Sequence, residues 1–313
     1  MKKKPVVVLT GPTGAGKTKL SIELAKRIGA SIISADSVQV YKGLDIGSDK
    51  ISPKDMDEID HYLVDILDPL EKFDVTLFKE LAEEAFSKIW KEGRIPLLVG
   101  GTAFYIRAVV YDTEFEKESG GGIYRKELEE RLKNGEDLYE ELKRSDQRSA
   151  EKIHPNNTKR IIRALEFYHE NGYPISEHNE AQRKKKSPYN LAYFVLNDDR
   201  QRLYEKINDR AQKMIERGLE DEVRGLLEKG IPKDSHCFNS IGYSEMVKYM
   251  EGGLSMEETL RTIKQNTRHF AKRQLTWFRK EEDAVFINKN ELNFDDEKIL
   301  GTMMDMLIKK GIV

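Results

Sequence analysis

The feature that most constrains this sequence is a glycine-rich run at residues 11–18. Its letters, Gly-Pro-Thr-Gly-Ala-Gly-Lys-Thr, fit the pattern G-x-x-x-x-G-K-[ST] of phosphate loops. A β-branched apolar run at residues 6–9 precedes it, and Leu20, Leu24 and Ile28 follow it at helical spacing. Strand, loop and helix in this order predict a backbone cradle for a diphosphate or triphosphate at a helix N-terminus.

Each residue type in this run suits phosphate binding. The predicted phosphate-binding residues are Gly11, Pro12, Thr13, Gly14, Ala15, Gly16, Lys17 and Thr18. Lys17 supplies a mobile cation, and the hydroxyl of Thr18 is the expected ligand of a phosphate-bound Mg²⁺.

Strand-like and helical patterns alternate along the chain except in one segment. Strands are predicted at residues 6–9, 31–34, 62–66, 95–99, 192–196 and 284–288, and helices at 17–28, 76–91, 200–217, 219–229, 243–250 and 256–278. After about Tyr111 we find only helices, such as 158–171, and polar loops. We therefore predict an α/β fold, a P-loop NTPase-like parallel sheet flanked by helices, with an all-helical insertion domain that begins near the glycines at 120–122. The catalytic core is predicted at 1–112 and 191–313, and the insertion at 113–190.

The loop alone does not identify its phosphate compound. Most such loops bind ATP or GTP, so the default interpretation is a small-molecule kinase. However, Gly100-Gly101-Thr102 follows the strand at 95–99, where a metal-holding acid is expected in such enzymes. Asp36 lies just past the second strand, where ligands of open sheets bind. On position alone, it is either a general base or a cap for the next turn.

Composition excludes several classes of protein. Cys237 is the only cysteine, so there is neither a disulfide framework nor a cysteine-rich zinc site. No apolar run approaches the roughly 20 residues that span a membrane, and the N-terminal run is too short for a signal peptide. We therefore expect a cytoplasmic protein without a membrane partner.

Blocks along nearly the whole chain resemble one enzyme family. They are the runs at 11–18, 36–47, 65–69, 96–102, 154–156, 241–243 and 271–279, in that order. Together they resemble the tRNA dimethylallyltransferases, also called tRNA isopentenyltransferases. The chain departs from the family pattern at 119–122, where a Pro-x-Ala-Asp-like turn is usual. Ser48-Asp49 replaces the usual Thr-Ala, and Asn239-Ser240 the commoner Gln-Ala. The zinc finger of eukaryotic members is absent.

This resemblance implies transfer of a dimethylallyl group from dimethylallyl diphosphate to N6 of adenosine 37, in tRNAs that read codons beginning with U. The phosphate loop would hold the leaving diphosphate, so no ATP hydrolysis is implied. Asp36 would take the proton of the amine, and Thr13 would donate to the diphosphate at the breaking C–O bond. Lys17, Arg210 and Mg²⁺ on Thr18 would neutralise the developing charge. The adenine would be flipped out of the anticodon stem-loop to reach this site, and we expect the enzyme to be a monomer.

The resemblance also implies a set of tRNA contacts. These are Asp36, Ser37, Val38, Gln39, Thr102, Arg125, Lys159, Arg160, Arg163, Ile241, Gly242, Tyr243, Lys272, Arg273, Trp277 and Arg279.

The distribution of charge agrees with an RNA partner. The net charge is only −2, from 53 Lys and Arg against 55 Asp and Glu, and this sum alone argues against binding to nucleic acid. Residues 261–280, however, hold seven Lys and Arg and no acid, next to Trp277 and Phe278. A basic helix face is often merely solvated, but one that lacks acids and adjoins aromatic rings fits an RNA backbone.

Two other hypotheses remain open on the sequence alone. A small-molecule kinase would turn over ATP without tRNA, and it leaves the basic helix unexplained. An RNA-binding P-loop protein without activity would bind tRNA and leave it unaltered.

Overall fold

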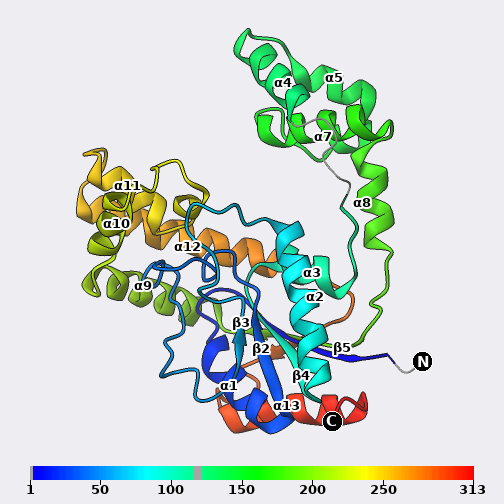
Figure 1. The fold of residues 1–313 in the computed structure, drawn as a ribbon, viewed down its shortest axis with the longest axis vertical. Coiled ribbons are helices and arrows are strands. Elements are labelled where there is room, and N and C mark those ends of the chain that lie inside the picture. The colour runs from blue at the N-terminus through cyan, green and yellow to red at the C-terminus, as the bar shows by residue number, and fades with distance from the viewer. Residues whose placement is uncertain (1–2, 116–121) are drawn as a thin grey trace. The chain divides into compact units, whose positions relative to one another are not determined.

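The computed structural model describes residues 3–115 and 122–313. The chain divides into two compact units, each drawn in Figure 1. Unit 1 combines Met1–Val110 with Ser187–Val313, and unit 2 is Tyr111–Lys186. Two of the three glycines near which the insertion was predicted to begin, at 120 and 121, lie outside the described residues.

Unit 1 is built on a six-stranded sheet in which all neighbours are parallel. The strands are β1 (Pro5–Thr10), β2 (Ala30–Ser34), β3 (His61–Tyr62), β4 (Ile95–Gly100), β5 (Asn190–Asn197) and β6 (Ala284–Asn288), in the spatial order β3-β2-β4-β1-β5-β6. β4 therefore lies between β1, which leads into the phosphate loop, and β2, which leads to Asp36. This order sets the geometry of the site.

Helices cover both faces of the sheet, as its buried strands require. The helices that contact its strands are α1 (Lys17–Ile28), α2 (Val75–Lys91), α3 (Ala103–Val110) and α13 (Asp296–Lys309). Unit 1 also contains α9 (Arg200–Glu216), α10 (Leu219–Glu228), α11 (Tyr243–Met250) and α12 (Met256–Phe278), with a short 3₁₀ helix at His236–Asn239. Leu24 of α1 and Met303 of α13 share one core with Val7 and Leu9. Val6 and Val8 point the opposite way and are equally buried, and α2 packs against β2 and β4.

All the regular secondary structure described in unit 2 is helical. Its helices are α4 (Ile123–Lys133), α5 (Leu138–Ser145), α6 (Gln147–Ala150), α7 (Thr158–Asn171) and α8 (Ile175–Arg183). They enclose a hydrophobic core of their own, in which Leu128, Leu142 and Leu165 are buried.

The predicted α/β fold with a parallel sheet is confirmed, and one predicted strand is wrong in extent. The sequence suggested residues 62–66, but β3 ends at Tyr62. Leu63 and Asp65 adopt positive φ, which ends the ladder. The following residues pair instead with the segment after β2, through bonds from the N–H of Asp65 to Gln39 O and from that of Ile66 to Val40 O. Among the described residues, no helix is long and apolar enough to cross a membrane.

Candidate active site

The phosphate loop joins a central strand to α1. β1 ends at Thr10 and α1 begins at Lys17. Gly11 lies so close to β5 that a β-carbon there would come 2.5 Å from the carbonyl oxygen of Leu196. Gly16 caps α1 in the left-handed conformation, with φ at 81°. The first N–H groups of α1 have no partner within the helix, so this end is suited to an anion.

Lys17 folds back over this loop. Its Nζ donates to the carbonyl oxygens of Gly11 at 3.1 Å and Pro12 at 3.0 Å. Burial, and then the positive charge of Arg210, lower the pKa of Lys17 to about 8, while the charges of Asp36 and Asp49 act in the opposite direction. Arg210 and Asp36 thus both lie within electrostatic reach of Lys17.

Asp36 occupies the first turn after β2. Its Oδ1 accepts from the N–H groups of Val38 at 2.9 Å and Gln39 at 3.4 Å, so the side chain does cap the turn. Among the described residues, no hydrogen bond is found to Oδ2. The turn therefore orients the carboxylate and uses only one of its oxygens, so capping does not exclude a role as a base. That role stays a prediction.

The end of β4 and the loop after it pack closely against Ala35, the residue before Asp36. A β-carbon on Gly100 would lie 2.2 Å from the carbonyl oxygen of Ala35. The N–H of Thr102 donates to that oxygen at 3.2 Å, and the N–H of Ala35 donates to Val99 O at 2.8 Å. Thr102, a predicted tRNA contact, is half-buried here and anchors the backbone beside Asp36.

Arg210 of α9 pairs with Asp49, an acid to which the sequence analysis assigned no role. Its Nη1 lies 3.4 Å from Asp49 Oδ2, and Nη1 of Arg217 lies 3.6 Å from Asp49 Oδ1. Asp49 adopts a positive φ of 51° in an exposed loop. No helical or strand periodicity marks such a residue, so only the fold reveals its position between two arginines.

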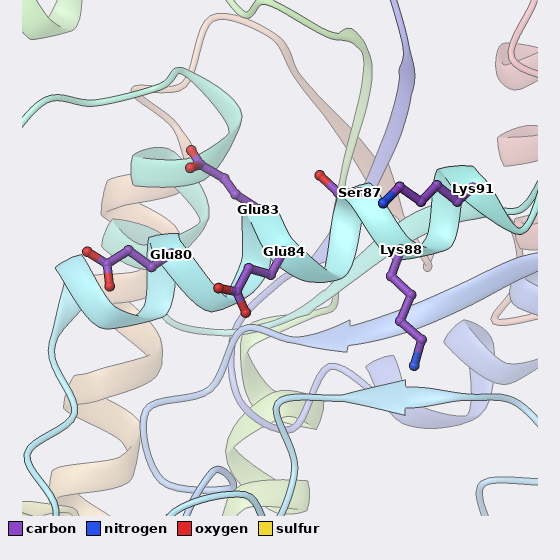
Figure 2. A pocket seen from close by; sticks show the side chains of 6 residues that line it. All are labelled: Glu80, Glu83, Glu84, Ser87, Lys88 and Lys91. Atoms are coloured by element: carbon purple, nitrogen blue, oxygen red, sulfur yellow. The ribbon is translucent and has the colours of Figure 1, made fainter.

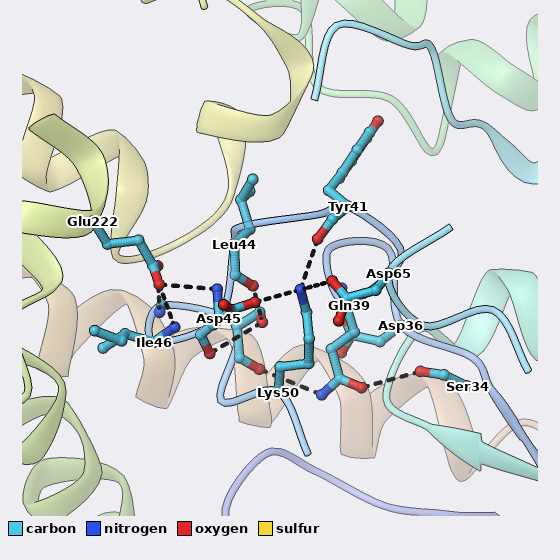
Figure 3. A network of polar contacts seen from close by, with 12 residues as sticks. Ser34, Asp36, Gln39, Tyr41, Leu44, Asp45, Ile46, Lys50, Asp65 and Glu222 are labelled. Atoms are coloured by element: carbon cyan, nitrogen blue, oxygen red, sulfur yellow. Dashed lines mark hydrogen bonds and ion pairs between the residues drawn. The ribbon is translucent and has the colours of Figure 1, made fainter. Parts of the chain in front are cut away.

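A polar network fixes the loop that carries Asp49 (Figure 3). The Glu222 carboxylate accepts from the N–H groups of Asp45, Ile46 and Gly47, at 3.0, 2.7 and 3.2 Å. The buried Nζ of Lys50 donates to Tyr41 O and Asp45 Oδ1 and pairs with Asp65. Gln39, a predicted tRNA contact, accepts from Ser34 Oγ at 3.1 Å and faces the same loop. Glu222 and Lys50 were missed by the sequence analysis, since isolated charged residues give no local signal.

Tyr243 is a buried member of this network. Its side chain is fully buried, its hydroxyl donates to Glu222 Oε1 at 2.6 Å, and its ring lies where a β-carbon of Gly47 would be. Burial, and then the Glu222 charge, raise the pKa of Tyr243. Among the other predicted tRNA contacts nearby, Gly242 is buried and Ile241 half-buried. In this structure the Tyr243 ring supports the loop and offers no face to a nucleobase.

α12 presents the predicted basic surface. We call its exposed cations the α12 track: Arg261, Lys272 and Arg273 of the helix, with Arg279 and Lys280 just beyond it. Trp277 is 39% exposed, and its ring centroid is 6.1 Å from that of the exposed Phe104. Arg268, by contrast, is tied to α9 through Asn208 Oδ1 at 2.7 Å.

The cations predicted on unit 2 differ in their environment. Arg125 and Arg163 both pair with Glu166, which is only 1% exposed. Burial alone would raise the pKa of Glu166, but the hydrogen bonds and charges of the two arginines hold it below its usual range. Lys159 and Arg160 are exposed at the start of α7. Exposure leaves these two accessible to a phosphate backbone, whereas Arg125 and Arg163 also neutralise a buried acid.

The hollow drawn in Figure 2 lies away from these groups. Glu80, Glu83, Glu84, Ser87, Lys88 and Lys91 line it. All six project from the exposed side of α2, so no second element closes over them. It therefore adds nothing to the candidate site.

The donor atoms present fit a magnesium ion carried on a diphosphate. Thr18 exposes its hydroxyl in the first turn of α1. The described residues contain no group of three or more His, Cys, Asp or Glu side chains that could hold a metal on their own. Mg²⁺ commonly takes few protein ligands and keeps waters and substrate phosphates. Thr18 thus fits the expected role, which stays a prediction.

Comparisons with known proteins agree with this geometry. A model of the IPP transferase family matches residues 39–281. The chain is 49% identical over 312 residues to a tRNA dimethylallyltransferase of Lachnoclostridium phytofermentans, covering 99% of each protein. It is 43% identical over 309 residues to one from Acetivibrio thermocellus, covering 98% of each. The crystal structure of the tRNA isopentenylpyrophosphate transferase of Bacillus halodurans aligns with a TM-score of 0.74 and 39% identity, over 99% of this chain and 98% of that one.

These matches extend over both units and over the candidate site. The family model begins within the Asp36 turn and ends just beyond α12, and the relatives also cover the phosphate loop. The kinase alternative is not favoured by these relatives. The chain belongs to the IPP transferase family.

Proposed function

We propose that this protein is a tRNA dimethylallyltransferase that acts on N6 of adenosine 37, in tRNAs that read codons beginning with U. One observation carries the proposal beyond family membership. Arg210 and Asp36 both lie within electrostatic reach of Lys17, the lysine of the phosphate loop. Cations for a leaving diphosphate and a carboxylate for the attacking amine are therefore combined in one site.

Each group has a role in the proposed reaction. The N6 nitrogen attacks C1 of the dimethylallyl group, the bond from C1 to the diphosphate oxygen breaks, and the N6 proton passes to Asp36. Thr13, only 8% exposed in the phosphate loop, donates to the bridging oxygen. Lys17 and Arg210 stabilise the charge that develops on the diphosphate. Mg²⁺ on Thr18 would neutralise further diphosphate charge when bound.

Positioning supplies much of the remaining rate, because a neutral exocyclic amine is a poor nucleophile. The α12 track would bind the backbone of the anticodon stem-loop, and the target adenine would leave its stack. Both sets of residues come from one chain, which agrees with a monomeric enzyme.

Mass analysis of tRNA tests the proposal. Unmodified tRNA with adenosines at 36 and 37 is incubated with the protein, Mg²⁺ and dimethylallyl diphosphate. We expect the mass of one isoprenoid unit to be added at position 37. ATP turnover without tRNA would favour the kinase alternative, and binding of tRNA without a mass change would favour the inactive RNA-binding protein.

The Asp36→Asn variant tests the assigned base. Without a proton acceptor, transfer should fall by a factor of about 10² or more, while calorimetry should find diphosphate affinity nearly unchanged. The amide keeps the oxygen that caps the turn, so the loop should stay in place. A variant that retains full activity would exclude Asp36 as the base.

A further inference from the structure

A buried amide links α12 to the phosphate loop. Gln274 is 5% exposed, on the inward face of the helix that carries the α12 track. Its Oε1 accepts from the N–H of Thr13 at 2.9 Å, and its Nε2 donates to the carbonyl oxygen of Gly101 at 2.9 Å. Both polar ends of the side chain are therefore used, one by each of two loops at the carboxyl edge of the sheet.

The contact with Gly101 depends on that residue's lack of a side chain. A β-carbon at Gly101 would lie 2.3 Å from Gln274 Nε2. The glycine thus lets the amide approach the loop after β4, and that loop is itself bonded to the residue before Asp36 through Thr102 and Ala35. A continuous chain of hydrogen bonds runs from Thr13 through Gln274 and the β4 loop to the Asp36 turn.

This series of hydrogen bonds crosses the carboxyl edge of the sheet, where the reaction is proposed to take place. β4 lies between β1 and β2, so the loop after β4 separates Thr13, which would donate a hydrogen bond to the leaving group, from Asp36, which would accept the amine's proton. Gln274 also accepts from the Thr13 N–H, and this bond fixes the backbone from which the Thr13 side chain projects. Small displacements of reacting groups cost large factors in rate.

We infer that Gln274 is a positioning residue for the proposed transfer, and that it holds Thr13 at a fixed spacing from Asp36. The inference rests on the proposed function. Gln274 touches neither substrate in the proposed reaction; it acts through the backbone of Thr13 and Gly101. The same helix presents the α12 track, so the element that would receive the tRNA also sets the geometry of the leaving-group site.

Two variants and a control test the inference. Gln274→Met keeps the approximate volume and removes both hydrogen bonds. Gln274→Glu keeps the acceptor for Thr13 but, when ionised, has no donor for Gly101. Gln201→Met, on the exposed side of α9, makes the same chemical change away from the site. Thermal unfolding establishes which variants are folded.

We expect Gln274→Met to lower kcat by about 10- to 100-fold, with little change in KM or in the calorimetric affinity for inorganic diphosphate. Gln201→Met should match the wild type. For Gln274→Glu, the ratio of its kcat to that of the wild type should rise as the pH falls from 8 to 6. Protonation of the introduced carboxyl restores a donor to Gly101, and burial favours the protonated form.

Opposite outcomes overturn the inference. A folded Gln274→Met protein with wild-type kcat excludes the positioning role, as does a ratio for Gln274→Glu that does not change with pH. The ratio for folded Gln274→Glu tests the inference even if Gln274→Met fails to fold. A wild-type protein that transfers no prenyl group would overturn the proposed function as well, whereas an active wild type with unaffected variants overturns the inference alone.

Discussion

At the scale of single residues, the cations of the candidate site already interact with acceptors of the protein itself. Lys17 donates to two loop carbonyls, and Arg210 lies beside Asp49. A diphosphate that binds here replaces these partners, so its affinity is the difference between two sets of interactions. The charge of Lys17 and the carboxylate of Asp49 should therefore both change the measured affinity for diphosphate.

The lowered pKa of Lys17 predicts a pH dependence of diphosphate binding. The ammonium is fully charged well below its pKa of about 8 and loses its charge as the pH rises through that value. The affinity for a diphosphate monoester, measured by calorimetry, should therefore weaken between pH 7 and pH 9. Lys17→Arg stays charged over this range, so the ratio of wild-type to variant affinity removes the ligand's own titration. A ratio that is constant with pH would contradict the low pKa.

Removal of the Asp49 charge is expected to strengthen diphosphate binding. The carboxylate competes with the diphosphate for Arg210 and repels it, so Asp49→Asn should tighten binding by about two- to fivefold, as is typical of a half-exposed ion pair. Asp45→Asn, in the same loop but paired with Lys50, serves as the control. Weaker binding by Asp49→Asn would mean that the acid orients Arg210 productively.

At the scale of elements, α12 has two faces of different character. Gln274 and Ala271 face inward, while Lys272 and Arg273 are exposed. The concentration of cations and the lack of acids over residues 261–280 were readable from the sequence, because both are local properties of one segment. The partner of Gln274 was not readable, because Thr13 is 261 positions away and only the tertiary fold brings the two together.

The exposed face of α12 predicts a salt dependence of tRNA binding. Lys272→Gln with Arg273→Gln should weaken binding and reduce the slope of log K against log salt by about 0.7 to 0.9 for each phosphate that is no longer neutralised. Filter binding at several salt concentrations measures this slope. Lys298→Gln with Lys309→Gln removes the same charge from exposed positions on α13 and should leave the slope unchanged. An equal decrease in both variants would indicate general attraction only.

At the scale of the whole molecule, each unit has buried hydrophobic residues of its own. Leu142 is buried in unit 2 and Leu24 in unit 1. Each Leu→Ala change should cost about 2 to 5 kcal/mol. Hydrogen exchange followed by mass spectrometry should then show faster exchange within 122–186 for Leu142→Ala, and within the sheet for Leu24→Ala. Faster exchange in both units for either variant would show that they unfold as one.

Much of this organisation was predictable from the sequence, because buried strands and amphipathic helices have distinct periods. The ends of α1, α7, α11 and α12 match the predicted ranges. The β3 segment was not predictable, since positive φ at Leu63 and Asp65 follows from pairing with a distant loop. For the same reason, the network of Glu222 and Lys50 appears only once the loop after β2 is folded.

Unit 1 consists of two separate stretches of the chain, and this affects its folding during translation. β1 lies between β4 and β5, yet roughly 90 residues separate the end of β4 at Gly100 from the start of β5 at Asn190. At typical rates of translation this interval lasts roughly 5 to 20 s. Throughout it, the apolar strand β1 has one unpaired edge, which is the kind of edge that recruits other chains. The nascent sheet therefore keeps an open edge while the second unit is being synthesised.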